Sequence, residues 1–307
     1  IYVATPHTSH FELSAKCLMN KKPVLCEKPM TINATETMAL IDLSRKYKTL
    51  LMEAFMYKIH PQTQRVIELI KDRLKGPLQI KAEFCFSVDV PETHRLVNRD
   101  LGGGSILDIG CYPLSISRHA VGAVNDLNFM NPISIEANGE LNDQNIDLNA
   151  SASLIFEDGS TSEIKSATNM QTNSDVEISD GKVTVFINQP WHCGEFTERK
   201  SQIRIQNQLG EDEFVDIETE KGIYAIEIDH FSECLKNHEI ESSLVPHNDS
   251  HGNMIALDSW RKNLKIVYDD DRGEKRRIPI VQDISKRESL PTMKISGIEK
   301  DLSRIVF

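Results

Sequence analysis

Three residues form a consistent acid–base set if the fold brings them together: Lys28, and the neighbouring pair Asp108 and Tyr112. Lys28 follows a short apolar run, and ligands of open α/β sheets bind outside the carboxyl ends of the strands. Asp108 and Tyr112 are four residues apart, so they share one face if their segment is helical. A tyrosine that exchanges a proton near neutral pH needs a pKa well below ~10, and a nearby Lys ammonium lowers it. The plainer alternative is a surface lysine, an aspartate near a helix start and a core tyrosine.

Further candidates flank these three positions. Thr5, Pro6 and His10 follow the first apolar run, where a dinucleotide would pass. Arg95 precedes the glycines Gly102–Gly104 and is placed to meet a polar substrate. Because a lone histidine is more often structural, four receive no role: His7, His60, His192 and His230. No G-x-G-x-x-G loop, which would hold a pyrophosphate, occurs in the sequence.

The elements that must position these residues follow from hydrophobic periodicity. In residues 1–74, short apolar strands alternate with amphipathic helices, which predicts a parallel sheet covered by helices with right-handed crossovers. Asn33 is expected to cap the second helix, with Glu36 completing a capping box. The expected elements are strands 1–4, 23–26 and 50–52, and helices 10–20, 34–41 and 62–74.

After Gly76-Pro77 the hydrophobic period becomes two, which predicts half-buried strands. Asp158-Gly159 and Asp180-Gly181 are typical of hairpin turns. The strands are expected at 80–88, 152–156, 183–187 and 203–205, with helices after Gly104 and at about 224–237 and 251–268. The predicted fold class is α/β: a partial doubly wound domain, then an α+β domain with a large, mostly antiparallel, open-faced sheet.

Composition bounds the class of protein. The 307 residues carry 35 Lys and Arg against 46 Asp and Glu, a net charge of −11, which argues against nucleic-acid binding. With 39% hydrophobic and 26% charged residues, the composition indicates a soluble globular protein and excludes collagen, coiled coil and general disorder. No apolar stretch approaches the roughly 18 residues of a membrane span.

The cysteines and tryptophans are interpreted as core residues. The six cysteines never form a C-x-x-C pair, which favours reduced thiols in a cytoplasmic protein and no metal site. Trp191 and Trp260 are expected to pack in the core, although Trp191, beside a histidine, keeps the alternative of a sugar platform. Residues 269–277 form a mixed charge run that predicts a solvated loop.

Four segments, in this order, resemble the glucose–fructose oxidoreductase / inositol dehydrogenase / MocA-like family. Residues 3–10 resemble its strand and loop facing the nicotinamide, and residues 24–29 its E-K-P signature. Residues 51–62 and 101–113 are similar to the branch of dimeric dihydrodiol dehydrogenase and NADP-dependent xylose dehydrogenases. The resemblance covers about residues 1–280. It implies a partial Rossmann domain and NAD(P)-dependent hydride transfer at a CH–OH or C=O carbon of a sugar, polyol or dihydrodiol.

The resemblance also implies roles for single residues. Lys28, Asp108 and Tyr112 match the family's catalytic positions, with Tyr112 as the acid–base residue and Lys28 lowering its pKa. The cofactor-binding positions implied are Thr5, Pro6, His10, Glu27, Lys28, Pro29 and Glu53. The substrate-binding positions implied are Arg95, Asp108 and Tyr112. The family implies no nucleic-acid or membrane partner and a homodimer formed through the open sheet face; the branch favours NADP over NAD.

The organisation expected from the resemblance has three parts. Residues 1–57 would be the end of a Rossmann domain, residues 58–281 a substrate-binding and dimerisation domain, and residues 282–307 a tail. Because family members open with a Gly-rich βαβ unit, we expect an N-terminally truncated chain that binds NAD(P)H weakly. Residues 293–307 faintly resemble the opening strands of aldo-keto reductases, so a further barrel is a hypothesis. A non-catalytic cofactor- or sugar-binding protein is the alternative function.

Overall fold

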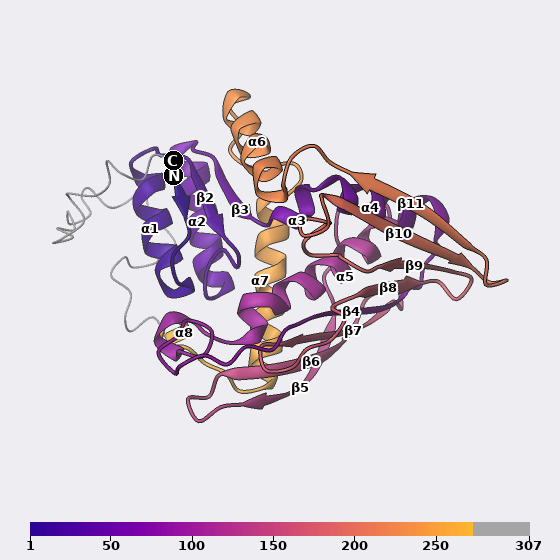
Figure 1. Ribbon diagram of the computed structural model, residues 1–307. Coiled ribbons are helices and arrows are strands. Elements are labelled where there is room, and N and C mark those ends of the chain that lie inside the picture. The colour runs from indigo at the N-terminus through magenta and orange to yellow at the C-terminus, as the bar shows by residue number, and fades with distance from the viewer. Residues whose placement is uncertain (273–307) are drawn as a thin grey trace.

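A computed structural model describes residues 1–272 and shows two β-sheets, each of which is covered by different helices (Figure 1). The first sheet contains β1 (Tyr2–Val3), β2 (Val24–Glu27) and β3 (Leu51–Ala54), in that order and all parallel. Helix α1 (His7–Met19) connects β1 to β2, and α2 (Ala34–Tyr47) connects β2 to β3. The predicted alternation of strands and helices is therefore confirmed.

The first residue of α2 was predicted correctly from the sequence, whereas the first residue of α1 was not. The Asn33 side chain accepts a 3.0 Å hydrogen bond from the Glu36 N–H, which confirms the predicted cap of α2. Helix α1 begins at His7, three residues earlier than expected. His7 and His10 are both buried on its inner face. The prediction used the spacing of apolar residues, so it did not recognise these histidines as buried positions of the helix.

The second sheet has eight strands in the order β11-β10-β9-β8-β4-β7-β6-β5. Neighbouring strands are antiparallel except β4 and β7, so the prediction of a mostly antiparallel sheet is confirmed. Asp158-Gly159 lies between β6 and β7, and Asp180-Gly181 between β8 and β9, as predicted. The strands are β4 (Gln79–Cys85), β5 (Ser134–Leu141), β6 (Asp147–Ile155), β7 (Thr161–Ala167), β8 (Val176–Ser179), β9 (Val183–Ile187), β10 (Lys200–Asn207) and β11 (Asp212–Glu218).

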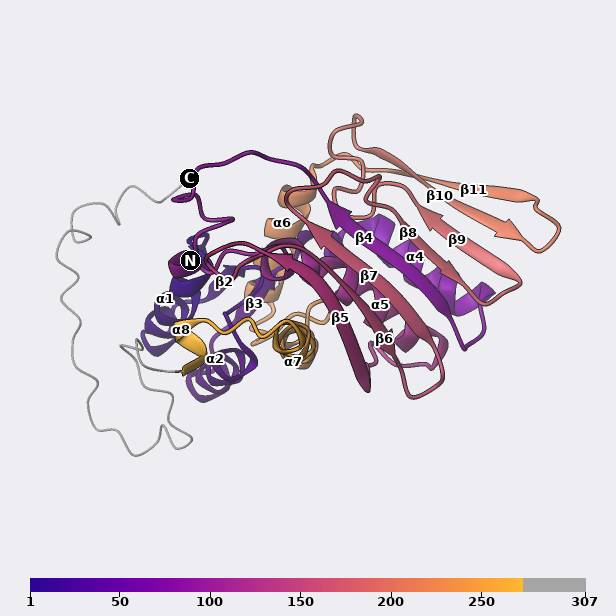
Figure 2. The same cartoon turned by 90° about the horizontal axis from the view of Figure 1, so that it is seen from below.

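One continuous row of apolar side chains crosses all eight strands of this sheet. The paired residues are Ala137, Ala152, Ile164, Ala82, Val176, Ile187, Ile203 and Val215. Helices α4 (Pro61–Arg73), α5 (Cys111–Val124) and α7 (His247–Asn263) lie on this side of the sheet (Figure 2). The opposite face carries mainly polar residues such as Lys81 and Glu163, so the alternation follows the pleat.

The remaining elements are short or connect the layers. They are α3 (Met56–Ile59), η1 (Arg99–Leu101), the π-helical turn η2 (Ile106–Gly110), α6 (Ile223–Lys236) and α8 (Asp269–Arg272). The predicted solvated loop is wrong for residues 269–272, because they form α8 and Asp271 pairs with Arg261 at 3.0 Å. The rest of that loop, the tail 282–307 and the barrel-like segment 293–307 lie outside the described residues.

The cysteines and tryptophans fall largely where they were expected. Five of the six cysteines are buried and Cys17 is half-buried, and all six are free thiols. Trp191 and Trp260 are both buried in the hydrophobic core, as predicted, and Trp191 also borders a cavity. None of the helices between residues 1 and 272 combines the length and the apolar character that crossing a bilayer requires.

Candidate active site

A cavity of about 900 Å³ opens where the carboxyl ends of β1 and β2 face the second sheet. It is lined by eight of the ten residues predicted for the site: Thr5, Pro6, His10, Glu27, Lys28, Arg95, Asp108 and Tyr112. A cavity of this size is typical of small-molecule sites. The fold therefore gathers residues from both sheets around one space, among them Lys28 and Asp108, which are 80 positions apart in sequence.

Lys28 and Arg95 both bind Asp108. Lys28 Nζ donates to the Asp108 carbonyl and lies 3.4 Å from Oδ1, while Arg95 Nη1 lies 2.8 Å from the same oxygen. Burial alone would raise the pKa of Asp108, but the charges of Lys28 and Arg95 hold it well below its usual range. Burial opposes the charge of Lys28, yet the Asp108 carboxylate raises its pKa overall. Asp108 therefore stays ionised and Lys28 stays an ammonium.

Asp108 is held in place by the loop and turn that precede it. Asp147 on β6 accepts hydrogen bonds from the Ile106 N–H at 2.6 Å and from the Ser105 hydroxyl at 2.9 Å. Burial raises the pKa of Asp147 to about 6. Gly104 has φ +121°, and a Cβ there would collide with the Asp147 carboxyl, so the turn requires glycine.

His7 lines the cavity although sequence reasoning gave it no role. Its Nδ1 lies 2.8 Å from the Gly102 carbonyl, which can only accept, so Nδ1 carries the proton. Burial lowers the pKa of His7 to about 3, which keeps the ring neutral. This bond connects α1 to the glycine loop. The segment Thr5-Pro6-His7 directly after a strand was the signal that pointed to it.

His10 joins the two loops that follow β1 and β2. Its Nε2 lies 2.7 Å from the Thr5 carbonyl and its Nδ1 lies 3.0 Å from the Pro29 carbonyl. Burial lowers the pKa of His10, so one ring nitrogen donates in the neutral form. His10 therefore fixes the segment that carries Lys28 relative to the end of β1.

Tyr112 lines the cavity, but its hydroxyl does not meet Lys28. The hydroxyl lies 3.3 Å from the Met56 sulfur, and Lys28 Nζ lies 5.4 Å from the centre of the tyrosine ring. Burial raises the pKa of Tyr112 well above its ordinary value. The expectation that Lys28 lowers this pKa is therefore wrong for this arrangement, because the ammonium is engaged by Asp108 and the phenol is desolvated.

Glu53 and Pro29, both predicted to bind cofactor, do not line the cavity. Glu53 is buried, and its Oε1 accepts a 2.9 Å hydrogen bond from the Met30 N–H. It therefore supports the loop after β2 from beneath. Pro29 is also buried, and its carbonyl faces His10. The family resemblance implied both positions, but neither residue borders the opening.

The far wall of the cavity is aromatic, which the sequence did not predict. The Phe84 and Trp191 rings stack with centroids 5.7 Å apart and planes at 18°, and Trp191 Nε1 donates to the Glu83 carbonyl at 2.9 Å. His192 and Phe196 extend this wall, with ring centroids 4.9 Å apart. The neighbouring Trp191-His192 pair was the only hint, since the segment lies in an irregular loop.

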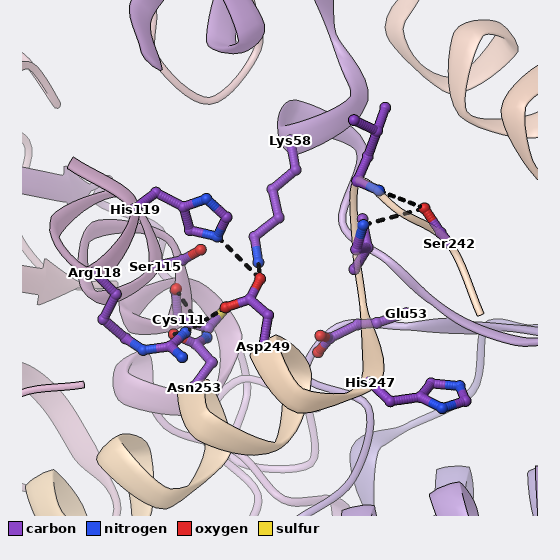
Figure 3. Close-up of polar contacts among 12 residues, drawn as sticks. Glu53, Lys58, Cys111, Ser115, Arg118, His119, Ser242, His247, Asp249 and Asn253 are labelled. Carbon is purple, nitrogen blue, oxygen red and sulfur yellow. Dashed lines mark hydrogen bonds and ion pairs between the residues drawn. The ribbon is translucent and has the colours of Figure 1, made fainter. Parts of the chain in front are cut away.

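A buried ionic network lies beneath the site (Figure 3). Asp249 on α7 receives Lys58 Nζ from α3, Arg118 Nη1 from α5 at 2.7 Å and His119 Nε2 from α5 at 2.9 Å. Burial would raise the pKa of Asp249, but Lys58, His119 and Arg118 lower it well below its usual range. The network ties three helices together, including the one that presents Met56 to Tyr112.

The residues at the ends of β1 and β2 fit a nicotinamide. Ala4, Thr5 and Pro6 are small and line the cavity next to Lys28, which leaves room for a flat ring. The opening lies at the carboxyl edge of a parallel sheet, where dinucleotides bind in doubly wound folds. Among residues 1–272 no group of three or more metal-ligating side chains gathers in one place.

Comparison with known proteins places the chain in a family. A family model described as an oxidoreductase family with an NAD-binding Rossmann fold matches residues 1–55. A second model, the GFO/IDH/MocA C-terminal domain, matches residues 63–187. The chain belongs to the GFO/IDH/MocA family. The resemblance inferred from the four sequence motifs is confirmed.

Curated relatives of this GFO/IDH/MocA chain include dehydrogenases and reductases. It is 35% identical over 174 residues to trans-1,2-dihydrobenzene-1,2-diol dehydrogenase of Xenopus tropicalis, covering 56% of this chain and 50% of the relative. It is 31% identical over 168 residues to D-xylose 1-dehydrogenase (NADP(+)) 2 of Haloferax volcanii, covering 54% and 49%. The chain thus matches about half the length of these relatives.

Solved structures share the fold. Aldose–aldose oxidoreductase from Caulobacter crescentus has a TM-score of 0.74 at 22% identity, covering 86% of this chain and 76% of that one. A 3-ketoreductase from Actinomadura kijaniata, with NADP and TDP-benzene bound, has a TM-score of 0.72 at 22% identity, covering 85% and 77%. The predicted fold class, a Rossmann-type parallel sheet followed by a large mixed sheet, is confirmed.

Proposed function

We propose that the protein is an NAD(P)-dependent oxidoreductase that transfers hydride at a CH–OH or C=O carbon of a sugar, polyol or dihydrodiol. One observation carries this proposal: Lys28, Asp108 and Tyr112 line a single cavity at the carboxyl ends of β1 and β2. The names of the two dehydrogenase relatives support the reaction type, and the NADP in one relative's name favours NADP. A bound nicotinamide would supply or accept the hydride.

Lys28 acts on the substrate oxygen in this proposal. Its ammonium lies inside the cavity and has one firm partner, the Asp108 residue, so a donor remains for a substrate hydroxyl or carbonyl. A positive charge beside that oxygen stabilises the alkoxide character that develops during hydride transfer. The Asp108 carboxylate keeps Lys28 charged and fixes the position of its ammonium by forming an ion pair with it. Arg95 binds the same carboxylate.

Tyr112 is assigned the role of proton donor. Since burial keeps its phenol protonated, it can give a proton to the substrate oxygen when a carbonyl is reduced. In the oxidative direction the hydroxyl must first leave Met56 and approach Lys28, whose charge would then favour the phenolate. The pH optimum for reduction should therefore lie below that for oxidation.

The far wall fits a hydroxyl-rich substrate with an apolar face. The amide side chains of Gln171, Asn173 and Gln189 line the cavity beside the aromatic wall. Amides offer both donors and acceptors, which matches neighbouring hydroxyl groups. Aromatic rings pack against the C–H face of a sugar or the ring of a diol.

The test is an assay of the full natural chain with D-xylose, other aldoses and a trans-dihydrodiol, using NADP⁺ and NAD⁺ in turn. Lys28→Met and Tyr112→Phe should each lower kcat/KM by about 10²-fold or more. Lys22→Met and Tyr47→Phe are the matched controls, because both residues lie away from the cavity. Near-normal rates in both site variants would refute the mechanism. Cofactor binding without turnover of any substrate would instead support the alternative of a non-catalytic binding protein.

We also propose a homodimer formed through the open face of the eight-stranded sheet. Lys81, Lys165, Glu163 and Glu177 border a shallow hollow of about 430 Å³ on this face, so charges of both signs are available to a second copy. Light scattering on the full chain tests this proposal, and a monomer at micromolar concentration would contradict it. The free thiols further support a reducing compartment such as the cytoplasm.

A further inference from the structure

Glu227 on α6 is a buried acid that the proposed mechanism does not use. Its side chain is 2% exposed, and within residues 1–272 its Oε1 has no hydrogen-bond partner. Acidic side chains are seldom buried in this way without a cation or several donors. Glu227 therefore requires a physical explanation.

The charged group that acts most strongly on Glu227 is another carboxyl, Glu27, at the end of β2. Glu27 precedes Lys28 in the chain and lines the cavity. Its Oε1 accepts a hydrogen bond from the Tyr2 hydroxyl on β1, and its Oε2 lies 3.3 Å from the Lys28 N–H. Glu27 is thus held by neutral donors on the first sheet while Glu227 approaches from α6.

Tyr224, one turn before Glu227 on α6, forms part of the cavity wall and is half exposed. It interacts electrostatically with Glu27, Glu227 and Lys28. The Tyr2 side chain, on the first sheet, also interacts electrostatically with Glu27 and Glu227. Two acids and two tyrosines are therefore coupled electrostatically, with Tyr2 bonded to Glu27, and Glu27 from β2 and Tyr224 from α6 line the same cavity.

The cations near this cluster are engaged elsewhere. Lys28 binds Asp108, and Lys58 of α3, the helix packed against α6, binds the buried Asp249. Glu195, from the loop of the aromatic wall, adds a further negative charge near Tyr224 and accepts from the Ile223 N–H at 2.8 Å. One turn later on α6, the His230 ring bonds the Ser242 hydroxyl at 2.7 Å.

Two neighbouring carboxyls without a cation between them cannot both ionise at low cost. Glu227 is the more deeply buried of the two, so it is the one that keeps its proton. Burial, and then the charge of Glu27, raises the pKa of Glu227 to about 8. Titration near that pH would place a second negative charge beside Glu27 and push α6 away from the first sheet.

We propose that Glu227 is a positioning residue whose proton lets α6 pack against Glu27, and that its ionisation moves Tyr224 off the cavity wall and sets the alkaline limit of ligand binding. This inference rests on the proposed function only for its catalytic readout. A bound proton thus contributes to the shape of the site without touching substrate.

The first experiment measures thermal unfolding of the full chain from pH 5 to 9. The comparison includes wild type, Glu227→Gln, Glu27→Gln and the control Glu233→Gln, an exposed acid on the same helix. An acid with a raised folded pKa loses stability as pH rises from its unfolded pKa of ~4.3 to its folded pKa. The melting temperature of Glu227→Gln should therefore gain steadily on wild type from pH 5 to about 8, then stay level.

The control variant should follow wild type at every pH. In Glu27→Gln, the pH at which the melting temperature stops falling should be lower than in wild type. The substitution removes the negative charge that disfavours ionisation of Glu227. A constant difference between Glu227→Gln and wild type over the whole range would overturn the proposal. Such a result would show that Glu227 is ionised throughout or that its role is only packing.

The second experiment follows KM and kcat against pH. In wild type, KM should rise about tenfold per pH unit above about pH 8, with kcat changing less, and in Glu227→Gln this rise should move up by one pH unit or more. If KM rises at the same pH in Glu227→Gln as in wild type, the proposal is overturned. Failure of the proposed function is distinguishable, because it would abolish turnover in every variant and leave the unfolding profiles as described.

Discussion

Asp249→Asn is the sharpest test of how the helices beneath the site are held. The substitution keeps the shape of the side chain and removes its charge. Asp249 is fully buried, and Lys58 and Arg118 are 2% and 0% exposed, so neither cation can turn to water when the carboxylate is lost. Breaking a buried ion pair by removing one partner costs about 3–5 kcal/mol.

That loss is a large part of a typical unfolding free energy of roughly 5–15 kcal/mol. It can be measured by urea denaturation followed by tryptophan fluorescence, with linear extrapolation to water. The control is Asp126→Asn, which removes an exposed carboxylate 2.7 Å from the exposed Lys71 and should leave stability nearly unchanged. Both substitutions replace Asp with Asn, so a difference between their unfolding free energies reflects the burial of Asp249 and its partners.

A second substitution shows whether charge is the cause. Lys58→Met, introduced into Asp249→Asn, removes one of the two uncompensated cations and should restore part of the lost stability. Because the folded pKa of Asp249 is depressed, its contribution is present above its unfolded pKa of ~3.9 and is lost as pH falls further. A loss of about 1 kcal/mol or less in Asp249→Asn, or no recovery in the double variant, would refute this reasoning.

The remaining predictions concern the glycine loop and the aromatic wall. Gly104→Ala should lower the unfolding free energy much more than Gly181→Ala. Both glycines have positive φ, costing about 1–3 kcal/mol for alanine, but only at Gly104 would the new Cβ strike a side chain, that of Asp147; urea titration compares them. Ligand-induced change in tryptophan fluorescence should persist in Trp260→Phe and disappear in Trp191→Phe, because only Trp191 lines the cavity; equal signals in both would contradict this placement.

The first sheet was predictable because each signal in it is local. The β2 strand is a short buried apolar run, and the Asn33 cap marks the start of α2 within four residues. The candidate site was predictable for a related reason. Lys28 follows a parallel strand, and all such strand ends meet at one edge. Asp108 and Tyr112 are close in sequence, so a helical turn brings both to the cavity.

The second sheet was only partly predictable. Strands β5 and β11, which were not expected, lie at its two edges, where few side chains are buried and the alternation of apolar residues fades. The central strands β7 and β8 were expected only as partners implied by the two hairpin turns, without bounds of their own. Strand β4 ends at Cys85 rather than at residue 88, and Val88 is exposed. Edge strands depend on pairing with a neighbour, which no local pattern reports.

The orientation of Tyr112 was also beyond the sequence. Its neighbours Met56 and Phe84 come from α3 and β4, and they decide that the hydroxyl faces sulfur and not the Lys28 ammonium. Which end of a ring meets a charge depends on tertiary packing. The loop of Trp191 and Phe196 was missed for the same reason, because it has no periodicity and is defined by the surfaces around it.

The pairing of Lys58 and Arg118 with Asp249 has a consequence for synthesis on the ribosome. Asp249 follows Arg118 by 131 residues and Lys58 by 191 residues. At roughly 5–20 residues per second, the intervening chain takes about 7–26 seconds to make after Arg118 and about 10–38 seconds after Lys58, and during this time each cation lacks its anion. The nascent chain therefore has to keep Lys58 and Arg118 hydrated until α7 emerges, and the ionic network beneath the site forms only after α7 has been made.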